Sequence, residues 1–268
     1  MRHLNSRLLL AAAASLGLTT IASAADLPAR TWTKAPMMDT PACAWCGWYV
    51  GGNGGFAFGN TTGNLTSSDV GFGSTVALGL IPTALGAKHD GGYGGGQFGY
   101  NFVTSNVLIG FEADIQGANI GSANTISLTN GTDSTSATTG RDRIDWFGTA
   151  RGRLGYSFGS VVLFGTGGLA FGGVGSQIQN NIAINGLGGQ ANTARSGDST
   201  AVGWAAGAGF EWMFAPSWSF KTEYLHVDLG STDLATVASG GSTNSGTYHF
   251  SHAFDSARLG INYHFSGY

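Results

Sequence analysis

Apolar and polar residues alternate at every second position in several segments of the chain, each about ten residues long. The clearest segment is 143–158, where Ile144 and Trp146 belong to an apolar face and Arg151 and Arg153 to a polar one. A period of two is that of a β-strand with different surroundings on its two faces. Weaker versions of the pattern raise the expected number of strands to about eight, at 46–58, 91–103, 107–116, 161–173, 202–214, 217–228 and 258–265.

The links between these segments are alternately short and long. The short links are 104–106, 159–160 and 215–217, and the long polar ones are 59–90, 119–142, 179–199 and 229–252. This asymmetry is typical of transmembrane β-barrels, which have short periplasmic turns and long outer loops. The sequence therefore predicts an all-β fold, an eight-stranded antiparallel up-and-down transmembrane barrel with four long, exposed and mobile outer loops.

The first long link contains an apolar stretch at 76–81. Two interpretations are open for it. It is either a short helix or half of an extra hairpin, and the hairpin would give a ten-stranded barrel with a wider lumen.

Aromatic residues fall near the ends of the predicted strands rather than at their middles. Trp and Tyr favour the membrane–water interface, so this distribution predicts two girdles. The periplasmic girdle would contain Trp48, Tyr156, Phe158, Trp212, Phe214, Trp218, Tyr263 and Phe265, and the outer girdle Phe56, Phe58, Trp146, Trp204 and Tyr224. Alternation alone does not show which face is the interior one, and a soluble sandwich is the competing fold.

The N-terminus favours the membrane fold because it has the features of a secretory signal. Arg2 and Arg7 flank the start of an apolar run over 8–18, and Ala22-Ser23-Ala24 forms a small-residue cleavage site. A retained membrane anchor is the alternative, but polar residues interrupt the run before it reaches spanning length. We expect a signal peptide at 1–24, a periplasmic lead-in at 25–45, the barrel at 46–265 and a C-terminal extension at 266–268.

Composition narrows the functional classes. The chain has 268 residues, of which 46 are Gly and 10% are charged, and its formal net charge is −3. These values do not suggest a nucleic-acid partner. The Gly content suits a small barrel, in which strands approach closely and bend.

Charged residues on the predicted lumen face are the main candidate site. They form a nearly balanced set, and isolated buried charges are costly, so paired charges could plug a lumen that is just wide enough for side chains. The alternative is a narrow pore in which the same residues tune ion selectivity. The predicted lumen charge network consists of Glu112, Asp114, Asp145, Arg151, Arg153, Glu211, Lys221, Glu223 and Arg258.

Other motifs carry weaker signals. Cys43 and Cys46 form a C-x-x-C pair without a βαβ unit around it, and in an oxidising periplasm a local disulfide is the expected state. Gly94 to Gly99 matches G-x-G-x-x-G, but no strand–helix context supports dinucleotide binding. His249 and His252 with flanking aromatics could bind a metal or haem, yet nothing else in the sequence completes such a site. We therefore expect no metal, cofactor or catalytic residue.

Two terminal motifs, Gly47-Trp48-Tyr49-Val50-Gly51-Gly52-Asn53 and 257–265, resemble the small outer-membrane immunogenic proteins of alphaproteobacteria. This porin-like family is related to OmpA-type barrels. The segments 25–30 and 223–230 are also similar to it. The resemblance implies an eight-stranded outer-membrane barrel with surface-exposed loops and no catalytic residues. It also implies a C-terminal signal for the barrel-insertion machinery, carried by Leu259, Gly260, Ile261, Tyr263 and Phe265, although Ser266-Gly267-Tyr268 extend the chain beyond the usual terminal aromatic.

Together these features predict a monomeric, non-enzymatic protein of the cell outer membrane with an envelope-structural and surface-exposed role. The expected partners are outer-membrane lipid, lipopolysaccharide and, during insertion, the barrel-assembly machinery. A small diffusion porin and an adhesin acting through 59–90 and 229–252 are the alternatives. A lipid-modifying hydrolase using His264 and Ser266 is disfavoured because no activated Ser-His-acid arrangement can be assigned.

Overall fold

The computed structural model describes residues 43–131, 134–184, 188–195, 199–238 and 245–266. Within these ranges, eight antiparallel strands pair in order round a closed ring, which is the fold expected from the sequence. The ring closes where the last strand pairs with the first, with Gly47 opposite Ser266. In ring order the strands are β1 (Gly47–Phe58), β4 (Gly91–Thr104), β5 (Val107–Thr129), β6 (Thr135–Phe158), β7 (Val161–Ile184), β9 (Ser199–Ala215), β10 (Trp218–Ala238) and β11 (Ser245–Ser266).

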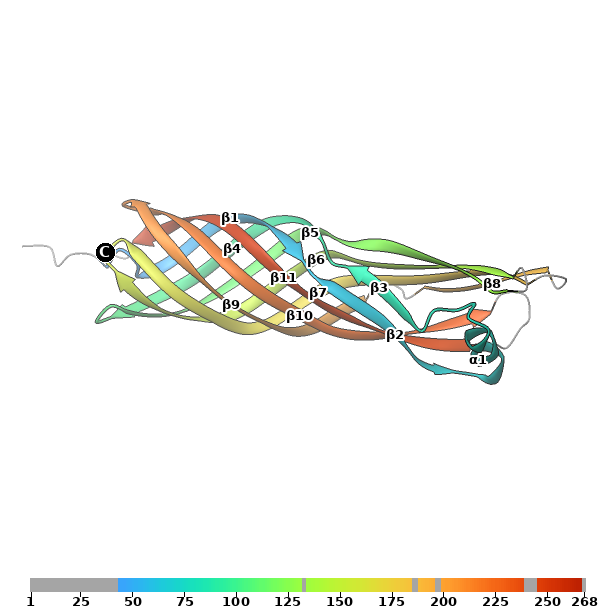
Figure 1. The fold of residues 1–268 in the computed structure, drawn as a ribbon. Coiled ribbons are helices and arrows are strands. Elements are labelled where there is room, and N and C mark those ends of the chain that lie inside the picture. Colours follow the sequence, from blue (N-terminus) through green and yellow to red (C-terminus); the bar gives the residue numbers. More distant parts are fainter. Residues whose placement is uncertain (1–42, 132–133, 185–187, 196–198, 239–244, 267–268) are drawn as a thin grey trace, which may run out of the picture. The chain divides into compact units, whose positions relative to one another are not determined.

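Tight turns join neighbouring strands at the end of the ring where β1 begins and β11 ends. Ser105 and Asn106 connect β4 to β5, and both have positive φ, at 48° and 72°. Such turns match the twist of the flanking strands and so suit two-residue hairpins. Figure 1 shows these turns at the end marked C. This is the periplasmic end, because the first strand begins there and the last strand ends there.

The long links differ from the sequence-based expectation. Most of their described residues are not loops but continue the strands in regular pairing, so that Thr129 of β5 lies opposite Thr135 of β6. Antiparallel neighbours satisfy each other's N–H and C=O groups whether or not lipid surrounds them, and the many Thr and β-branched residues here favour strands. The prediction that 119–142, 179–199 and 229–252 form loops is therefore wrong for most of their described residues.

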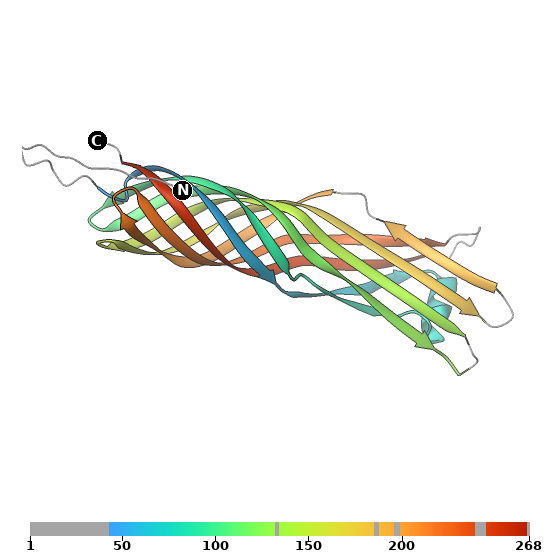
Figure 2. The ribbon, with the colours of Figure 1, turned by 90° about the horizontal axis from the view of Figure 1, so that it is seen from above.

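Three shorter strands prolong members of the ring: β2 (Asn60–Ser68), β3 (Ala84–Lys88) and β8 (Gly188–Arg195). After Gly59, β2 continues the line of β1 along β11 and pairs with β3, which leads into β4. Similarly, β8 pairs with the outer part of β7, at 177–184, and β9 pairs with the rest of that strand, at 161–174. Consequently the first link holds a paired extension and a short helix, α1 (Val70–Ala77), while the described ring keeps eight strands rather than ten. Figures 1 and 2 show these extensions and α1 away from the turn end.

A β-bulge changes the facing of β6. The pairing of β6 with β7 shifts between Ile144 and Trp146, which leaves Asp145 without a partner in the ladder. Because side chains alternate with period two, one extra residue exchanges the two faces beyond it. Ile144, predicted to face lipid, is buried, whereas Arg143 and Asp145 are exposed and lie 3.5 Å apart. The assignment of Asp145 to the lumen charge network is therefore wrong.

The outward face of the barrel is apolar. Ile115, Leu154 and Leu169 are about as exposed as surface residues of a soluble protein, at 60%, 62% and 62%. All members of the two predicted aromatic girdles also lie on this outward face. An apolar band between aromatic girdles is the surface of a protein that crosses a bilayer with strands. Among the residues that the structure describes, no helix has the length and apolar character to cross a membrane.

Candidate functional site: the lumen

The barrel interior contains a buried network of acidic and basic side chains. Eight of the nine residues predicted from the sequence meet there, each no more than 5% exposed. The described members are four acids and four bases: Glu112, Asp114, Glu211 and Glu223 with Arg151, Arg153, Lys221 and Arg258. Equal numbers of opposite charges let every member find a partner, which is the condition for burying ions at all.

Several of these contacts cross the axis of the barrel. Lys221 Nζ on β10 donates to both carboxylate oxygens of Glu112 on β5, at 2.6 and 2.5 Å. Going round the ring, β6, β7 and β9 separate these strands on one side, and β4, β1 and β11 on the other. The two residues therefore come from opposite walls. Arg151 of β6 similarly reaches Glu223 of β10 at 2.5 Å.

Glu112 is contacted by three bases of the network and by one hydroxyl. Besides Lys221, it accepts hydrogen bonds from Arg151 at 2.6 Å, from Arg258 at 3.0 Å and from the Tyr49 hydroxyl at 2.8 Å. Arg153 pairs instead with Glu211, and its guanidinium lies 4.0 Å from the ring centroid of Phe164. Charge-assisted hydrogen bonds of this kind fix the geometry of both partners.

Uncharged polar residues extend the network beyond what the sequence analysis identified. Tyr49 bonds to Glu112, and Asn262 links Glu211 to Gln97 at 2.7 and 2.5 Å. These residues occupy inward positions of strands that were already predicted. Charge was the signal used to choose candidates, and alternation applied to every polar residue would have added them.

Ser219, His264 and Glu211 have the residue types of a catalytic triad but not its geometry. The hydroxyl of Ser219 lies 2.9 Å from His264 Nε2 and also donates to Glu211. Glu211 approaches that same imidazole nitrogen, at 3.3 Å. In a triad the acid must instead hold the opposite ring nitrogen, so this group does not activate the serine.

A small residue makes room for the network at one point. A Cβ added to Gly99 of β4 would lie 2.5 Å from the hydroxyl of Tyr49 and from the carbonyl oxygen of Phe111. Both contacts are shorter than van der Waals separations, so a side chain here would displace the tyrosine that bonds Glu112. The close approach expected from the Gly content thus occurs beside the charges.

An apolar layer lies inside the barrel on the outer side of the charges. Phe147 is the centre of this layer, and its ring makes edge-to-face contacts with Tyr93 at 5.1 Å and with Phe254 at 5.4 Å. Buried aliphatic residues surround these rings, namely Ile120, Ile144, Val174, Leu225, Val227 and Leu229. This layer was not predicted because only charged residues were chosen as lumen candidates, although Phe147 keeps the phase of Arg151 along β6. The bulge accounts for Ile144 alone, which it turns inward.

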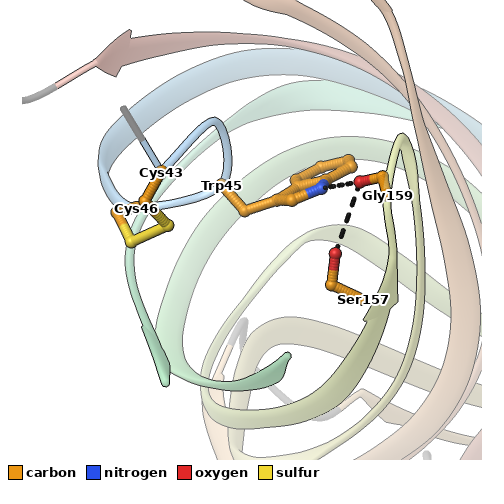
Figure 3. The surroundings of a disulfide bond; sticks show 5 residues. All are labelled: Cys43, Trp45, Cys46, Ser157 and Gly159. Carbon is orange, nitrogen blue, oxygen red and sulfur yellow. Dashed lines mark hydrogen bonds between the residues drawn. A yellow bond between two sulfur atoms is a disulfide. The ribbon is translucent and has the colours of Figure 1, made fainter. Parts of the chain in front are cut away.

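The periplasmic mouth is covered by the end of the lead-in. Cys43 and Cys46 form a disulfide, and the turn that it closes holds Trp45 at 3% exposure. The indole nitrogen of Trp45 donates to the carbonyl of Gly159, in the turn between β6 and β7, at 2.9 Å. Figure 3 shows this side chain lying between the disulfide and that turn. Trp45 packs with Leu108, Val162 and Phe164, so the mouth has an apolar cover.

At the outer end, α1 packs on the extended strands. Phe72 of this helix is fully buried in a second apolar cluster with Leu80, Tyr248 and Phe250. Asp69 is the N-cap, and its carboxylate accepts a hydrogen bond from the backbone N–H of Phe72 at 2.8 Å. This hydrogen bond, with others from Ser245, lowers the pKa of Asp69 from its ordinary value.

The histidines of β11 lie in different surroundings. His249 faces outward and bonds Asp233 at 2.7 Å, whereas His252 is fully buried and contacts Asp142 at 3.0 Å. The buried His89, which precedes β4, contacts the same carboxylate oxygen at 2.7 Å. The structure thus does not bring together the two histidines that the sequence suggested, and it gives His252 a different set of neighbours.

The residues of the expected insertion signal lie on β11. Leu259, Ile261, Tyr263 and Phe265 face outward, at 38% to 56% exposure. Gly260 lies on the lumen side, where an added Cβ would approach Asn53 and Gln97. Recognition of these residues by the barrel-insertion machinery stays a prediction. The expected signal peptide, the lead-in up to residue 42 and the extension at 267–268 lie outside the described residues.

A closed ring with a lipid-facing surface and a polar interior is the architecture of outer-membrane barrels. The model of one such family, the outer membrane protein beta-barrel domain, matches residues 10–265. The chain belongs to this family. It is 34% identical over 250 residues to a 31 kDa outer-membrane immunogenic protein of Brucella melitensis biotype 1, covering 92% of this chain and 94% of the relative. It is 27% identical to a 22 kDa outer membrane protein of Rhizobium leguminosarum bv. viciae, covering 82% and 78%.

Among solved structures, the outer membrane protein OprG of Pseudomonas aeruginosa matches with a TM-score of 0.41 and 14% identity, covering 83% of this chain and 97% of OprG. Family membership and the names of the relatives place this barrel protein in the outer membrane of a Gram-negative cell.

Proposed function

We propose that this family member is a closed outer-membrane barrel that stabilises the envelope and displays its extended strands at the cell surface, without conducting solutes and without catalysis. The observation that carries the proposal is the pairing of Glu112 with Lys221 across the lumen. Side chains from opposite walls that contact each other leave no continuous water path between them. An eight-stranded barrel is just wide enough for its side chains to fill.

Three further layers support a closed interior. The apolar layer around Phe147 lies on the outer side of the charges, and Trp45 covers the periplasmic mouth. The cluster around Phe72 closes the space between the extended strands. A solute would have to displace all four layers to pass. The porin interpretation has no comparable observation in its favour.

Single-channel recording in planar bilayers tests the closed state. The purified barrel is expected to stay silent over both voltage polarities. The matched variants are Glu112→Ala with Lys221→Ala, which keep the network neutral, combined with Phe147→Ala, Trp45→Ala and Phe72→Ala, one in each of the other three layers. This combined variant is expected to conduct. An outward control, Arg143→Gln with Asp145→Asn, is expected to remain silent, and discrete steps from the wild type would overturn the proposal.

Surface display rests on the ordered extensions and on the immunogenic character stated in the name of the Brucella relative. An epitope inserted after Gly131, at the tip between β5 and β6, should be accessible to antibody on intact cells. An epitope at the turn of Ser105 and Asn106 should be accessible only after permeabilisation. The opposite pattern would contradict the proposed orientation.

A further inference from the structure

A buried cluster of two histidines and one aspartate lies beyond the apolar layer, towards the outer end of the barrel. His89 precedes β4, Asp142 lies in β6 and His252 lies in β11, and all three are no more than 1% exposed. Their ligand-type atoms, two imidazole nitrogens and one carboxylate oxygen, lie within 4.8 Å of one another. Arg143 and Asp145 face outward next to Asp142, so this level lies above the hydrocarbon.

Each member of the cluster is held by a further polar group. His89 Nδ1 lies 3.2 Å from the carbonyl oxygen of Ala253, and His252 Nε2 lies 3.1 Å from the hydroxyl of Thr232. The second carboxylate oxygen of Asp142 accepts a hydrogen bond from Ser176 at 2.8 Å. Metal-binding histidines and carboxylates are oriented by partners of this kind, which fix the ring and leave the other atom free for the ion.

The other ring nitrogen of each histidine faces Asp142. His89 Nε2 and His252 Nδ1 both face the same oxygen of Asp142, at 2.7 and 3.0 Å. His89 therefore has acceptors at both of its nitrogens, the Ala253 carbonyl and the Asp142 carboxylate. Such an arrangement places either a proton or a metal ion between the imidazole nitrogen and the carboxylate oxygen.

We propose that His89, Asp142 and His252 form a structural binding site for a divalent transition-metal ion of the Zn²⁺ class. Two imidazole nitrogens and one carboxylate oxygen are donors that suit Zn²⁺, whereas Ca²⁺ and Mg²⁺ prefer oxygen alone. The site is independent of whether the lumen conducts, because it lies outside the charge network.

The geometry requires only a small adjustment. Ligands about 2.0–2.1 Å from a tetrahedral ion are roughly 3.3 Å apart. The two observed nitrogen–oxygen separations, 2.7 and 3.0 Å, would widen by about 0.6 and 0.3 Å. The two ring nitrogens, which lie within 4.8 Å of each other, would take up the same spacing. A water molecule would complete the coordination. The ion would then join the first outer link to β6 and β11, which are far apart in the sequence.

Metal content of the refolded protein tests the site. The untagged mature protein is refolded in detergent with and without equimolar ZnCl₂, because a buried site is best loaded during folding, and then freed of loose metal by gel filtration. About one zinc per chain is expected for the wild type, with a melting temperature several degrees higher than that of the zinc-free protein. Folding is checked in each sample by heat-modifiable gel migration.

The variants His89→Gln and His252→Gln are expected to lose at least nine-tenths of the bound zinc. His249→Gln is the matched control, because this histidine lies on the same strand but faces outward. It should bind as the wild type does. Folded wild type without zinc, or equal loss in the control and the two test variants, would overturn the proposal.

Cobalt provides a test that needs no variant to fold. Refolding the wild type with Co²⁺ should give the intense visible absorption of four-coordinate cobalt, removed by one equivalent of Zn²⁺. Folded wild type that shows only the weak absorption of hydrated Co²⁺ would contradict the site.

Discussion

Glu112→Gln isolates the energetic role of charge in the lumen network, because it keeps the shape of the side chain. The wild-type network is balanced, and Lys221, Arg151 and Arg258 all donate to this carboxylate. The variant leaves one positive charge in excess in the barrel interior, and the N–H₂ group of the new amide would face the same three cations. Removing one partner of a buried ion pair costs about 3–5 kcal/mol, so we expect the free energy of unfolding to fall by about that amount.

A second change, Lys221→Met, should restore most of this loss. It removes the surplus charge, and Glu223 keeps Arg151 at 2.5 Å and Arg258 at 2.6 Å as partners. Replacing a buried ion pair by apolar groups of similar volume is often neutral, so the double variant should lie within about 2 kcal/mol of the wild type. The coupling energy from the double-mutant cycle should then be at least about 2 kcal/mol.

Reversible urea unfolding of the barrel in phospholipid vesicles, followed by tryptophan fluorescence, measures these free energies. The exposed pair of Arg143 and Asp145 is the control, and its neutralisation should cost less than about 1 kcal/mol. A loss below about 1 kcal/mol for Glu112→Gln would refute the reasoning. So would a Lys221→Met effect that is equally large with and without Glu112.

Three other predictions concern the ends and the wall of the barrel. Trp45→Ala should lower the melting temperature of the refolded barrel, because it removes the apolar cover at the mouth, and an unchanged value would show that the cover adds no stability. Since its pKa is lowered, Asp69 stabilises the docked α1 fully above its ordinary value of 3.8, and this contribution disappears as pH falls through the lower folded value. Protection of the Phe72 amide from hydrogen exchange, measured by NMR, should fall over the same pH range. In Asp69→Asn this protection should not depend on the charge at position 69. Gly99→Val should reduce the heat-modifiable fraction after refolding, because the new side chain collides with Tyr49, whereas the outward Gly96→Val should have little effect.

The fold could be predicted because patterns between near neighbours in the chain indicate it. Alternation located the barrel strands, and the predicted short links at 104–106, 159–160 and 215–217 set their antiparallel order. The outward girdles followed from aromatic residues at strand ends. Each of these signals depends on near neighbours in the chain, and a closed ring is the arrangement that leaves no unpaired strand edge in lipid.

The interior could be predicted only in part. Eight charged residues lie in the lumen as predicted, because they keep the alternation of their strands. Asp145 does not, because the bulge in β6 changes which face its side chain joins, and no feature of the sequence indicates that bulge. The outer links were assigned as loops from their polar composition, although pairing with a neighbouring strand overrides composition. For the same reason the extensions of β1, β4 and β9 appeared only in the structure. The structure also decided between the two interpretations of the first link, because it places the helix α1 there and keeps eight strands in the described ring.

The sequence by itself predicted that this protein crosses a membrane with strands and carries a nearly balanced set of charges on its lumen face, because period and charge are properties of single segments. The tertiary structure decided which residues meet. Glu112 and Lys221 are joined across the ring, and His89, Asp142 and His252 gather from three distant segments, because ring closure and strand register bring together positions whose separation along the chain carries no such signal.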